Sequence, residues 1–186
     1  MMTRSLFIYL LIICSCQNAP KENVAESWIV TVASLKSKEQ KKEFLEEAYT
    51  ELFLIRRESD ASINNFGLNS KEHLKKKKIF NANRLKQFAK IDAYLNHHGY
   101  PSIMELGGKA AYAPYFVTQN MPDLKSREKN FTYLYDAYVF GNITVDLFYH
   151  YVSDLYYLKT NENYLFNPNV DTKFQIEDIM EELGYG

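Results

Sequence analysis

The sequence predicts a mainly α-helical protein, an irregular bundle of about five or six helices after a signal peptide and a short tether. Three observations lead to this prediction. Apolar residues recur at three- and four-residue spacing through much of the chain, as they do on one face of a helix. Glycine and proline number only 7 and 5 in 186 residues, which disfavours an all-β fold with many turns. The apolar content of 46% is enough for a packed core.

Residues 1–15 are predicted to be a lipoprotein signal peptide. Arg4 precedes an apolar run over 6–13, which is shorter than the ~20 helical residues that cross a bilayer but has the length of a signal core. The next residues, Ile13-Cys14-Ser15-Cys16, resemble a lipobox, with an aliphatic residue at −3 and a small residue before the cysteine. That resemblance implies cleavage before Cys16 and its acylation with several chains, since one chain holds a protein only marginally. The alternatives are a plain secretory signal and an uncleaved anchor.

Residues 16–27 are expected to form a lipidated tether, and residues 28–186 a single helical domain. The tether is polar and has no hydrophobic period. The segment Trp28-Ile29-Val30-Thr31-Val32 is β-prone, so we expect a short strand or an irregular packed segment there. Beyond Cys16 the sequence has no further cysteine, so no structural disulfide is expected.

Helix signals recur along the domain. Pro114 lies inside one apolar segment and is expected to break or bend that helix. Polar caps and terminal glycines mark several of the ends. The expected caps and stops are Asn69 or Ser70, Thr144, Asp171, Gly99 and Gly184. The expected helices cover residues 37–60, 70–96, 110–119, 124–140, 144–159 and 171–183.

The charge is balanced overall but uneven along the chain. With 22 basic and 23 acidic residues, nothing indicates a nucleic-acid partner. Residues 70–90 are nonetheless strongly basic, and this segment is a candidate membrane-facing surface because anionic headgroups attract such clusters. The alternatives are a solvated face and a contact with the acidic segment 171–182. The segment contains four consecutive lysines, Lys75, Lys76, Lys77 and Lys78.

Residues 85–184 carry several short motifs: Lys90-Ile91-Asp92, Gly99-Tyr100-Pro101-Ser102, a glycine pair at 107–108, then Gln119, Asp154 and Leu183-Gly184. In these motifs this half of the chain resembles a family of helical proteins of unknown function that is common among lipoproteins and secreted proteins of Bacteroidota. The sequence departs from the family at polar positions. Asn120 replaces a histidine, Leu155 replaces an arginine, and residues 161–166 lack a Gln-x-Tyr-Gly element. If the family has a catalytic site, this chain is expected to have lost parts of it.

A polar pocket is a further candidate site, formed by Asp92, Gln119, His150 and Asp154. The last two, with Asp146, are spaced four residues apart and so line one helix face. A histidine and two carboxylates could bind a metal or relay a proton, and the alternative is a solvated stripe. The pair at 97–98 is expected to close a helix, where positive charge is favoured, with metal ligation as the alternative. The sequence has no nucleophile elbow and no zinc-protease helix motif, and no cofactor is expected.

The leading functional hypothesis is a non-enzymatic lipoprotein of the bacterial cell envelope, anchored in the outer rather than the inner membrane. It would bind another envelope protein or component through an aromatic-rich helical surface. The 15 tyrosines and 12 phenylalanines suit both helix packing and a contact surface. The alternatives are an enzyme of unidentified, for instance hydrolytic, chemistry and a lipoprotein that binds a metal or a small molecule.

Overall fold

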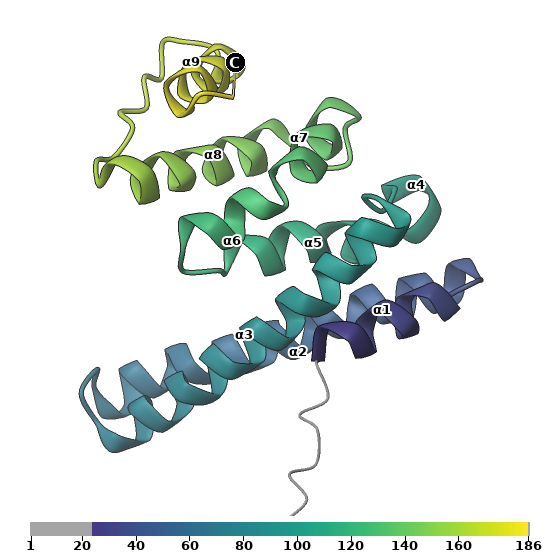
Figure 1. Cartoon of the computed structure of the whole chain (residues 1–186). Coiled ribbons are helices and arrows are strands. Elements are labelled where there is room, and N and C mark those ends of the chain that lie inside the picture. Colours follow the sequence, from purple (N-terminus) through teal and green to yellow (C-terminus); the bar gives the residue numbers. More distant parts are fainter. Residues whose placement is uncertain (1–23, 186) are drawn as a thin grey trace, which may run out of the picture.

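The computed structural model describes residues 24–185, which form nine helices and no strand (Figure 1). The prediction of a mainly α-helical fold is therefore confirmed. The expected number of five or six helices is wrong. Two short helices, α1 (Val24–Ser34) and α4 (Ile103–Leu106), flank the long hairpin, and the helix expected over 124–140 is divided at Asn130. The predicted signal peptide and residues 16–23 of the predicted tether, Cys16 included, lie outside the described residues. Residues 24–27, also predicted as tether, are instead the start of helix α1.

Helices α2 (Lys38–Phe66) and α3 (Lys71–His98) form a long hairpin. A capping box starts α2, in which the Ser37 hydroxyl accepts a hydrogen bond from Gln40 N–H and the Gln40 side chain accepts one from Ser37 N–H. Gly67, with φ of 84°, ends α2 in the left-handed region that favours glycine. Ser70 caps α3, as its sequence position predicts. The turn between the helices is therefore only four residues long, and they lie side by side.

The β-prone segment at 28–32 is helical, so the expectation of a strand or an irregular segment is wrong. Helix α1 packs against α3, with Val32 buried and the Trp28 ring edge-on to Phe44 at a centroid distance of 6.1 Å. Because Trp28 and Val32 are one helical turn apart, a helix directs both toward the hairpin. A lone strand would leave its backbone groups unpaired, so packing overrides the β-propensity here.

Helix α5 (Gly108–Gln119) lies against the hairpin and contacts both α2 and α3. It runs through Pro114 as one helix, so the expected break is absent. The residues around Pro114 are buried, and their packing outweighs the one backbone hydrogen bond that proline removes. The chain then adds α6 (Leu124–Lys129), α7 (Phe131–Val139), α8 (Val145–Thr160) and α9 (Thr172–Leu183), with α9 packed on α8 at the end farthest from the hairpin (Figure 1).

Two clusters of buried side chains hold these layers together. The first joins α1, α2, α3 and α5, and the second joins α5, α7, α8 and α9. Tyr100 and Tyr112 pack against both clusters, so the two cores are continuous. None of the helices in residues 24–185 has the length and apolar character needed to cross a membrane.

Most tyrosines and phenylalanines of the described part are buried or half-buried within these clusters. Their rings stack closely, as in Phe131 on Tyr185 at 4.0 Å and Tyr138 on Phe148 at 4.6 Å. The high aromatic content therefore serves mainly to pack the helices. The exposed aromatic side chains are spread over several elements and are Phe66, Tyr135, Phe140, Tyr157, Phe166 and Phe174.

Candidate functional site

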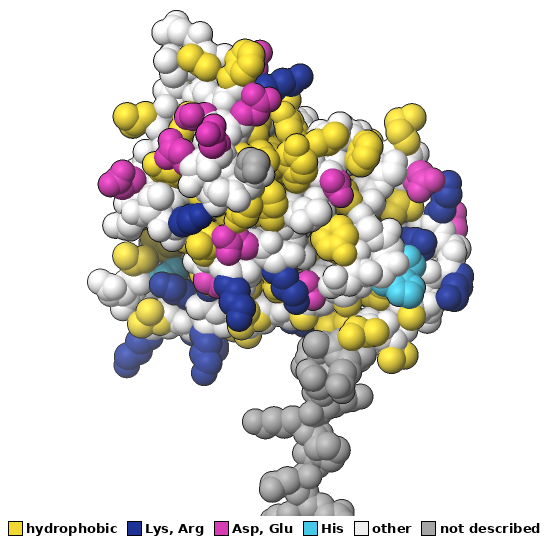
Figure 2. Space-filling view, turned by 45° about the horizontal axis from the view of Figure 1, so that its top comes forward, with side chains coloured by type: hydrophobic (Ala, Val, Ile, Leu, Met, Phe, Trp, Pro, Cys, Tyr) yellow, Lys and Arg dark blue, Asp and Glu magenta, His cyan; other side chains and the backbone are white. Residues whose placement is uncertain are grey.

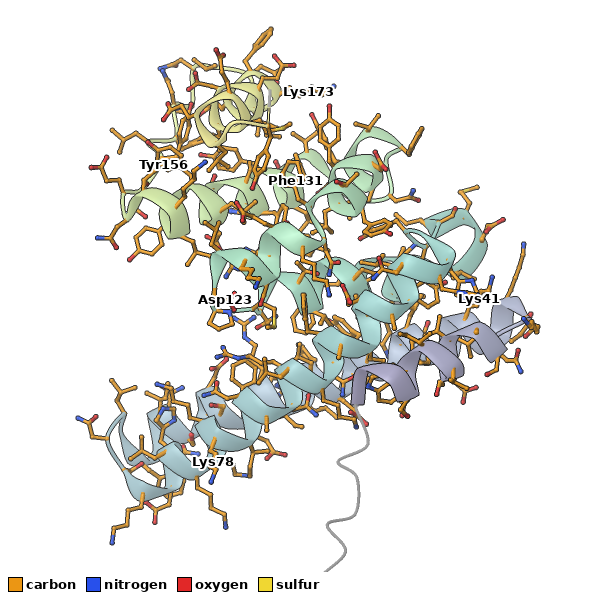
Figure 3. All side chains as sticks on the ribbon, viewed as in Figure 1. Lys41, Lys78, Asp123, Phe131, Tyr156 and Lys173 are labelled. Carbon is orange, nitrogen blue, oxygen red and sulfur yellow. The ribbon has the colours of Figure 1, made fainter. Side chains whose placement is uncertain are left out.

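A cleft of about 570 Å³ lies between the α2–α3 hairpin on one side and the α5–α6 turn and α8 on the other. Its volume is in the range of pockets that bind small molecules. Figure 3 shows Asp123, at the start of α6, facing α3 across this region. The lining residues are Arg56, Ser59, Asp60, Ile63, Leu68, His73, Lys77, Phe80, Asn81, Arg84, Gln119, Asn120, Met121, Pro122, Arg127 and Asp154.

Two of the four predicted pocket residues meet in this cleft. Gln119, the last residue of α5, donates from Nε2 to Asp154 Oδ2 over 2.6 Å. Arg127 of α6 forms an ion pair with the same oxygen at 2.9 Å, and its Nε donates to the Met121 carbonyl over 2.8 Å. Asp154 thus ties the end of α5 and α6 to α8. The guanidinium of Arg127 is fixed by two acceptors, so it is a rigid part of the wall.

A second contact links the wall to the hairpin. Arg56 of α2 donates from Nη1 to Asn120 Oδ1 over 3.0 Å, and the Asn120 amide donates to the Phe116 carbonyl over 2.7 Å. Arg56 also lies 3.7 Å from Asp60. These contacts connect α2 to the end of α5 along one edge of the cleft.

Arg84 of α3 differs from the other two arginines of the cleft, each of which has an ion-pair partner. No residue that the structure describes accepts a hydrogen bond from its Nε, which is buried. Among the ion pairs in residues 24–185, none uses Arg84. The guanidinium instead lies 5.4 Å from the centre of the Phe80 ring. Burial lowers the pKa of Arg84, and the Asp123 carboxylate partly opposes that shift.

The cleft has an excess of positive charge. Four basic side chains line it, those of Arg56, Lys77, Arg84 and Arg127, against the carboxylates of Asp60 and Asp154. Both carboxylates already have an arginine partner. The positive charge of Lys77 and Arg84 therefore has no paired counter-charge on the lining.

The other two predicted pocket residues lie elsewhere. Asp92 accepts from Lys129 Nζ over 2.7 Å in a separate hollow beside α1, and its other carboxyl oxygen is buried with no donor among the described residues. His150 is exposed one turn before Asp154, outside the cleft, with its ring 6.0 Å from that of Tyr149. The four residues therefore do not form one pocket, because Asp92 lies too far along α3 and the His150 side chain points to solvent.

His73 and His98 have packing roles, whereas His97 is exposed. His73 is almost completely buried at the tip of the hairpin, where its Nδ1 shares a 2.9 Å hydrogen bond with the Ser62 hydroxyl. His98 closes α3 with Nε2 3.1 Å from the Val32 carbonyl, and burial lowers its pKa. Within residues 24–185 no three His, Cys, Asp or Glu side chains lie close enough to hold a metal ion.

The four consecutive lysines divide among three surroundings, as their wrapping around a helix requires. Lys76 forms an ion pair with Glu58 at 2.6 Å. Lys77 lines the cleft. Lys75 and Lys78 are exposed on the outer side of α3, and Figure 3 shows Lys78 near the free end of the hairpin.

The arginines are the residues of this site that sequence analysis does not single out. Arg56, Arg84 and Arg127 come from three helices, and no spacing in the sequence links them. No protein-family model, curated protein or solved structure matches the chain. The cleft and the surface charge of the hairpin are therefore the features of the molecule that bear on its function.

Proposed function

We propose that the protein is a lipoprotein of the cell envelope that acts by binding rather than by catalysis. In this proposal residues 1–15 direct export, Cys16 carries the acyl chains in the outer membrane, and the helical domain rests its basic α3 face on the bilayer. The observation that carries the proposal is the composition and position of that face. We also propose that the chain is related to the Bacteroidota family that it resembles, on the basis of the Gly99–Ser102 motif.

The outer face of α3 combines positive charge with exposed apolar side chains. Residues at positions 71, 74, 75, 78 and 85 share one side of the helix because they follow the three- and four-residue period. All five side chains are exposed, and Leu74 and Leu85 are more than half so. Figure 2 shows Lys and Arg side chains projecting from the part of the molecule where the hairpin lies. Each lysine near an anionic membrane adds about 1 kcal/mol of attraction.

This face also lies beside the start of α1. Ile29 shares a hollow with Ala89, and Val32 contacts His98, so α1 runs in the same direction as α3. The first residue of α1 is therefore directed toward the lysine-bearing end of α3. Ile29 and Val30 are exposed and extend the apolar part of the face. A chain anchored before α1 would hold this side of the domain toward the membrane.

The length of the tether supports this orientation. Cys16 precedes Val24 by eight residues, which span at most about 28 Å when fully extended. The face from residue 71 to residue 89 is about 27 Å long at the rise of a helix. The tether is therefore no longer than the face, and the acyl chains would keep these lysines near the headgroups.

The hydrolytic alternative has partial support from the cleft, since Gln119 and Asp154 meet there. Asp154 Oδ2 already accepts hydrogen bonds from Gln119 and Arg127, so only Oδ1 remains to take a proton from a substrate. His150 is on the solvent side of α8. The exposed aromatic side chains are also scattered, so the cleft supports a binding role better than an aromatic surface does.

Metabolic labelling with a fatty-acid analogue tests the anchor. Cys16→Ala is expected to abolish labelling, and Cys14→Ala, two residues away, is the matched control that retains it. Continued labelling of Cys16→Ala would refute the lipoprotein assignment. Mass spectrometry of the native product should find an acylated Cys16 at its N-terminus.

Vesicle flotation of the unlipidated chain from residue 17 tests the basic face. Binding to vesicles with anionic lipid is expected to fall with the double change Lys75→Gln and Lys78→Gln, and to fall with added salt. The control removes the same charge from α5 and α6 with Lys109→Gln and Lys125→Gln. Equal loss in both double variants would show that net charge, rather than the α3 face, governs binding.

A further inference from the structure

We infer that the cleft binds an oxyanion, a carboxylate or phosphate group of a small molecule or of an envelope component, and that Arg84 is its main contact. This inference rests on the proposed binding role of the domain and names the class of ligand. It is drawn from Arg84, the arginine of the cleft whose Nε is buried and has no acceptor among the described residues.

A partly buried guanidinium without an acceptor is an unfavourable arrangement. Removal from water disfavours the charge, and a hydrogen-bonded acceptor, above all an anionic one, compensates for the lost contact with water. The contact with Phe80 offsets part of this, since a cation over an aromatic ring gains about 0.5–2 kcal/mol. The planar fork of arginine fits two oxygens of a carboxylate or a phosphate, so an oxyanion would satisfy the group that the protein does not.

The carboxylate of Asp123, which partly opposes the lowering of the pKa of Arg84 by burial, accepts hydrogen bonds from another residue. Its Oδ1 accepts from the backbone N–H of Ser126 and its Oδ2 from the Ser126 hydroxyl, both over 2.9 Å, which caps α6. Asp123 therefore influences Arg84 across the cleft without forming an ion pair with it.

The rest of the lining suits a ligand that has an anionic group and, beside it, both polar and apolar parts. Lys77 lies one helical turn from Phe80 and two turns from Arg84, so its ammonium adds to the positive field on the same wall. Asn81 and Asn120 offer amide groups that can donate to oxygens. Leu68 and Met121 add apolar surface for a non-polar part of the ligand.

The chain contains a matched control for Arg84. Arg57 on α2 lies over the Phe53 ring at 5.6 Å, nearly the distance of Arg84 from Phe80. Arg57 is exposed and does not line the cleft. If Arg84 served only to pack on its ring, the two arginines would respond alike to substitution and to anions.

Calorimetric titration of the unlipidated chain with inorganic phosphate and with succinate, each against sodium chloride of equal ionic strength, tests the inference. At least one of the two anions is expected to bind. Arg84→Gln should weaken that binding about ten- to a hundredfold, the value of a charge-assisted hydrogen-bond pair. Arg57→Gln should leave it within about twofold. Arg84→Lys keeps the charge but loses the fork, and it should bind with intermediate affinity.

Flotation with phosphatidylglycerol vesicles separates the two sources of the oxyanion. Weaker flotation of Arg84→Gln than of Arg57→Gln indicates a lipid headgroup, and equal flotation with lost phosphate or succinate binding indicates a soluble ligand. The inference is overturned if neither anion binds the wild type, or if Arg84→Gln and Arg57→Gln bind the anion equally well. Neither result affects acyl labelling at Cys16, so the failure of this inference is distinguishable from the failure of the proposed function.

Discussion

Lys90 Nζ lies 2.6 Å from Glu47 Oε2, and the lysine side chain is 3% exposed while that of the glutamate is 58% exposed. The ammonium also lies 4.5 Å from the centre of the Phe44 ring and 5.4 Å from that of Trp28. The aliphatic part of the Lys90 side chain therefore fills space between α1, α2 and α3. Its buried ammonium is paired with the carboxylate of Glu47, which is at the surface. Such an arrangement joins core packing to an ion pair that is only half removed from solvent.

Shortening Lys90 should cost more stability than neutralising it. Lys90→Ala is expected to lower the free energy of unfolding by about 2–3 kcal/mol, because it opens a cavity beside Phe44. Lys90→Met keeps most of the volume and removes a buried ammonium, so its loss should stay within about 1 kcal/mol. Urea unfolding measures both. Lys86→Met, at an exposed ion pair, is the control, and equal losses for the two Lys90 variants would contradict the packing role.

The helical period of the sequence correctly locates the core face of α8. Leu155 and Tyr151 have no exposed surface. Leu155→Asp should therefore lower the stability by several kcal/mol, since it buries an unpaired carboxylate. Tyr157→Asp, two residues away on an exposed side chain, should change it by less than about 1 kcal/mol. A melting temperature of Leu155→Asp near that of the wild type would show that this face is not part of the core.

The fold was most predictable where local chemistry determines it. Ser70, Thr144 and Asp171 cap helices because each side chain accepts a hydrogen bond from the first turn, and Gly99 and Gly184 end helices at positive φ. The helical state of residues 28–32 could not be predicted, because it depends on a hairpin that begins later in the chain. Non-local packing decided that segment against its intrinsic preference.

The candidate site was predictable only in part for the same reason. Gln119 and Asp154 meet because α5 ends where α6 and α8 pack together, and the family resemblance placed both in one group. Arg84 lies 43 residues before Arg127 in the sequence, and nothing local distinguishes it from other basic residues of α3. Its lack of an acceptor becomes visible only in three dimensions.

Alkaline pH should destabilise the protein through its buried tyrosines. Burial, with a smaller effect of Glu105, raises the pKa of Tyr94 from 10 to about 12. The folded protein then keeps the phenolic proton at pH values where the unfolded chain has lost it. The stability due to this group is therefore complete below pH 10 and is lost as the pH rises from 10 to 12.

Tyr94→Phe isolates this effect from that of other tyrosines whose pKa burial also raises, such as Tyr151. Guanidinium unfolding measures the free energy of unfolding at pH 9 and at pH 11.5. Its decrease between the two pH values should be smaller for Tyr94→Phe than for the wild type, by roughly 1–2 kcal/mol. Tyr157→Phe, at an exposed ring, should lose as much as the wild type. An unchanged loss in Tyr94→Phe would mean that Tyr94 ionises as easily in the folded protein as in the unfolded chain.

Neutralising Asp154 tests whether the charge of the cleft governs its affinity for an anion. Asp154→Asn keeps a side chain of the same size that can still accept a hydrogen bond from Arg127 or Gln119, and it removes one of the two lining carboxylates. An anion bound at Arg84 would then meet less repulsion and more free positive charge from Arg127. Its affinity should rise about two- to fivefold, an electrostatic change of roughly 0.4–1 kcal/mol that added salt reduces. Calorimetry with the anion that binds the wild type measures it, and weaker binding in Asp154→Asn would indicate that the carboxylate itself contacts the ligand.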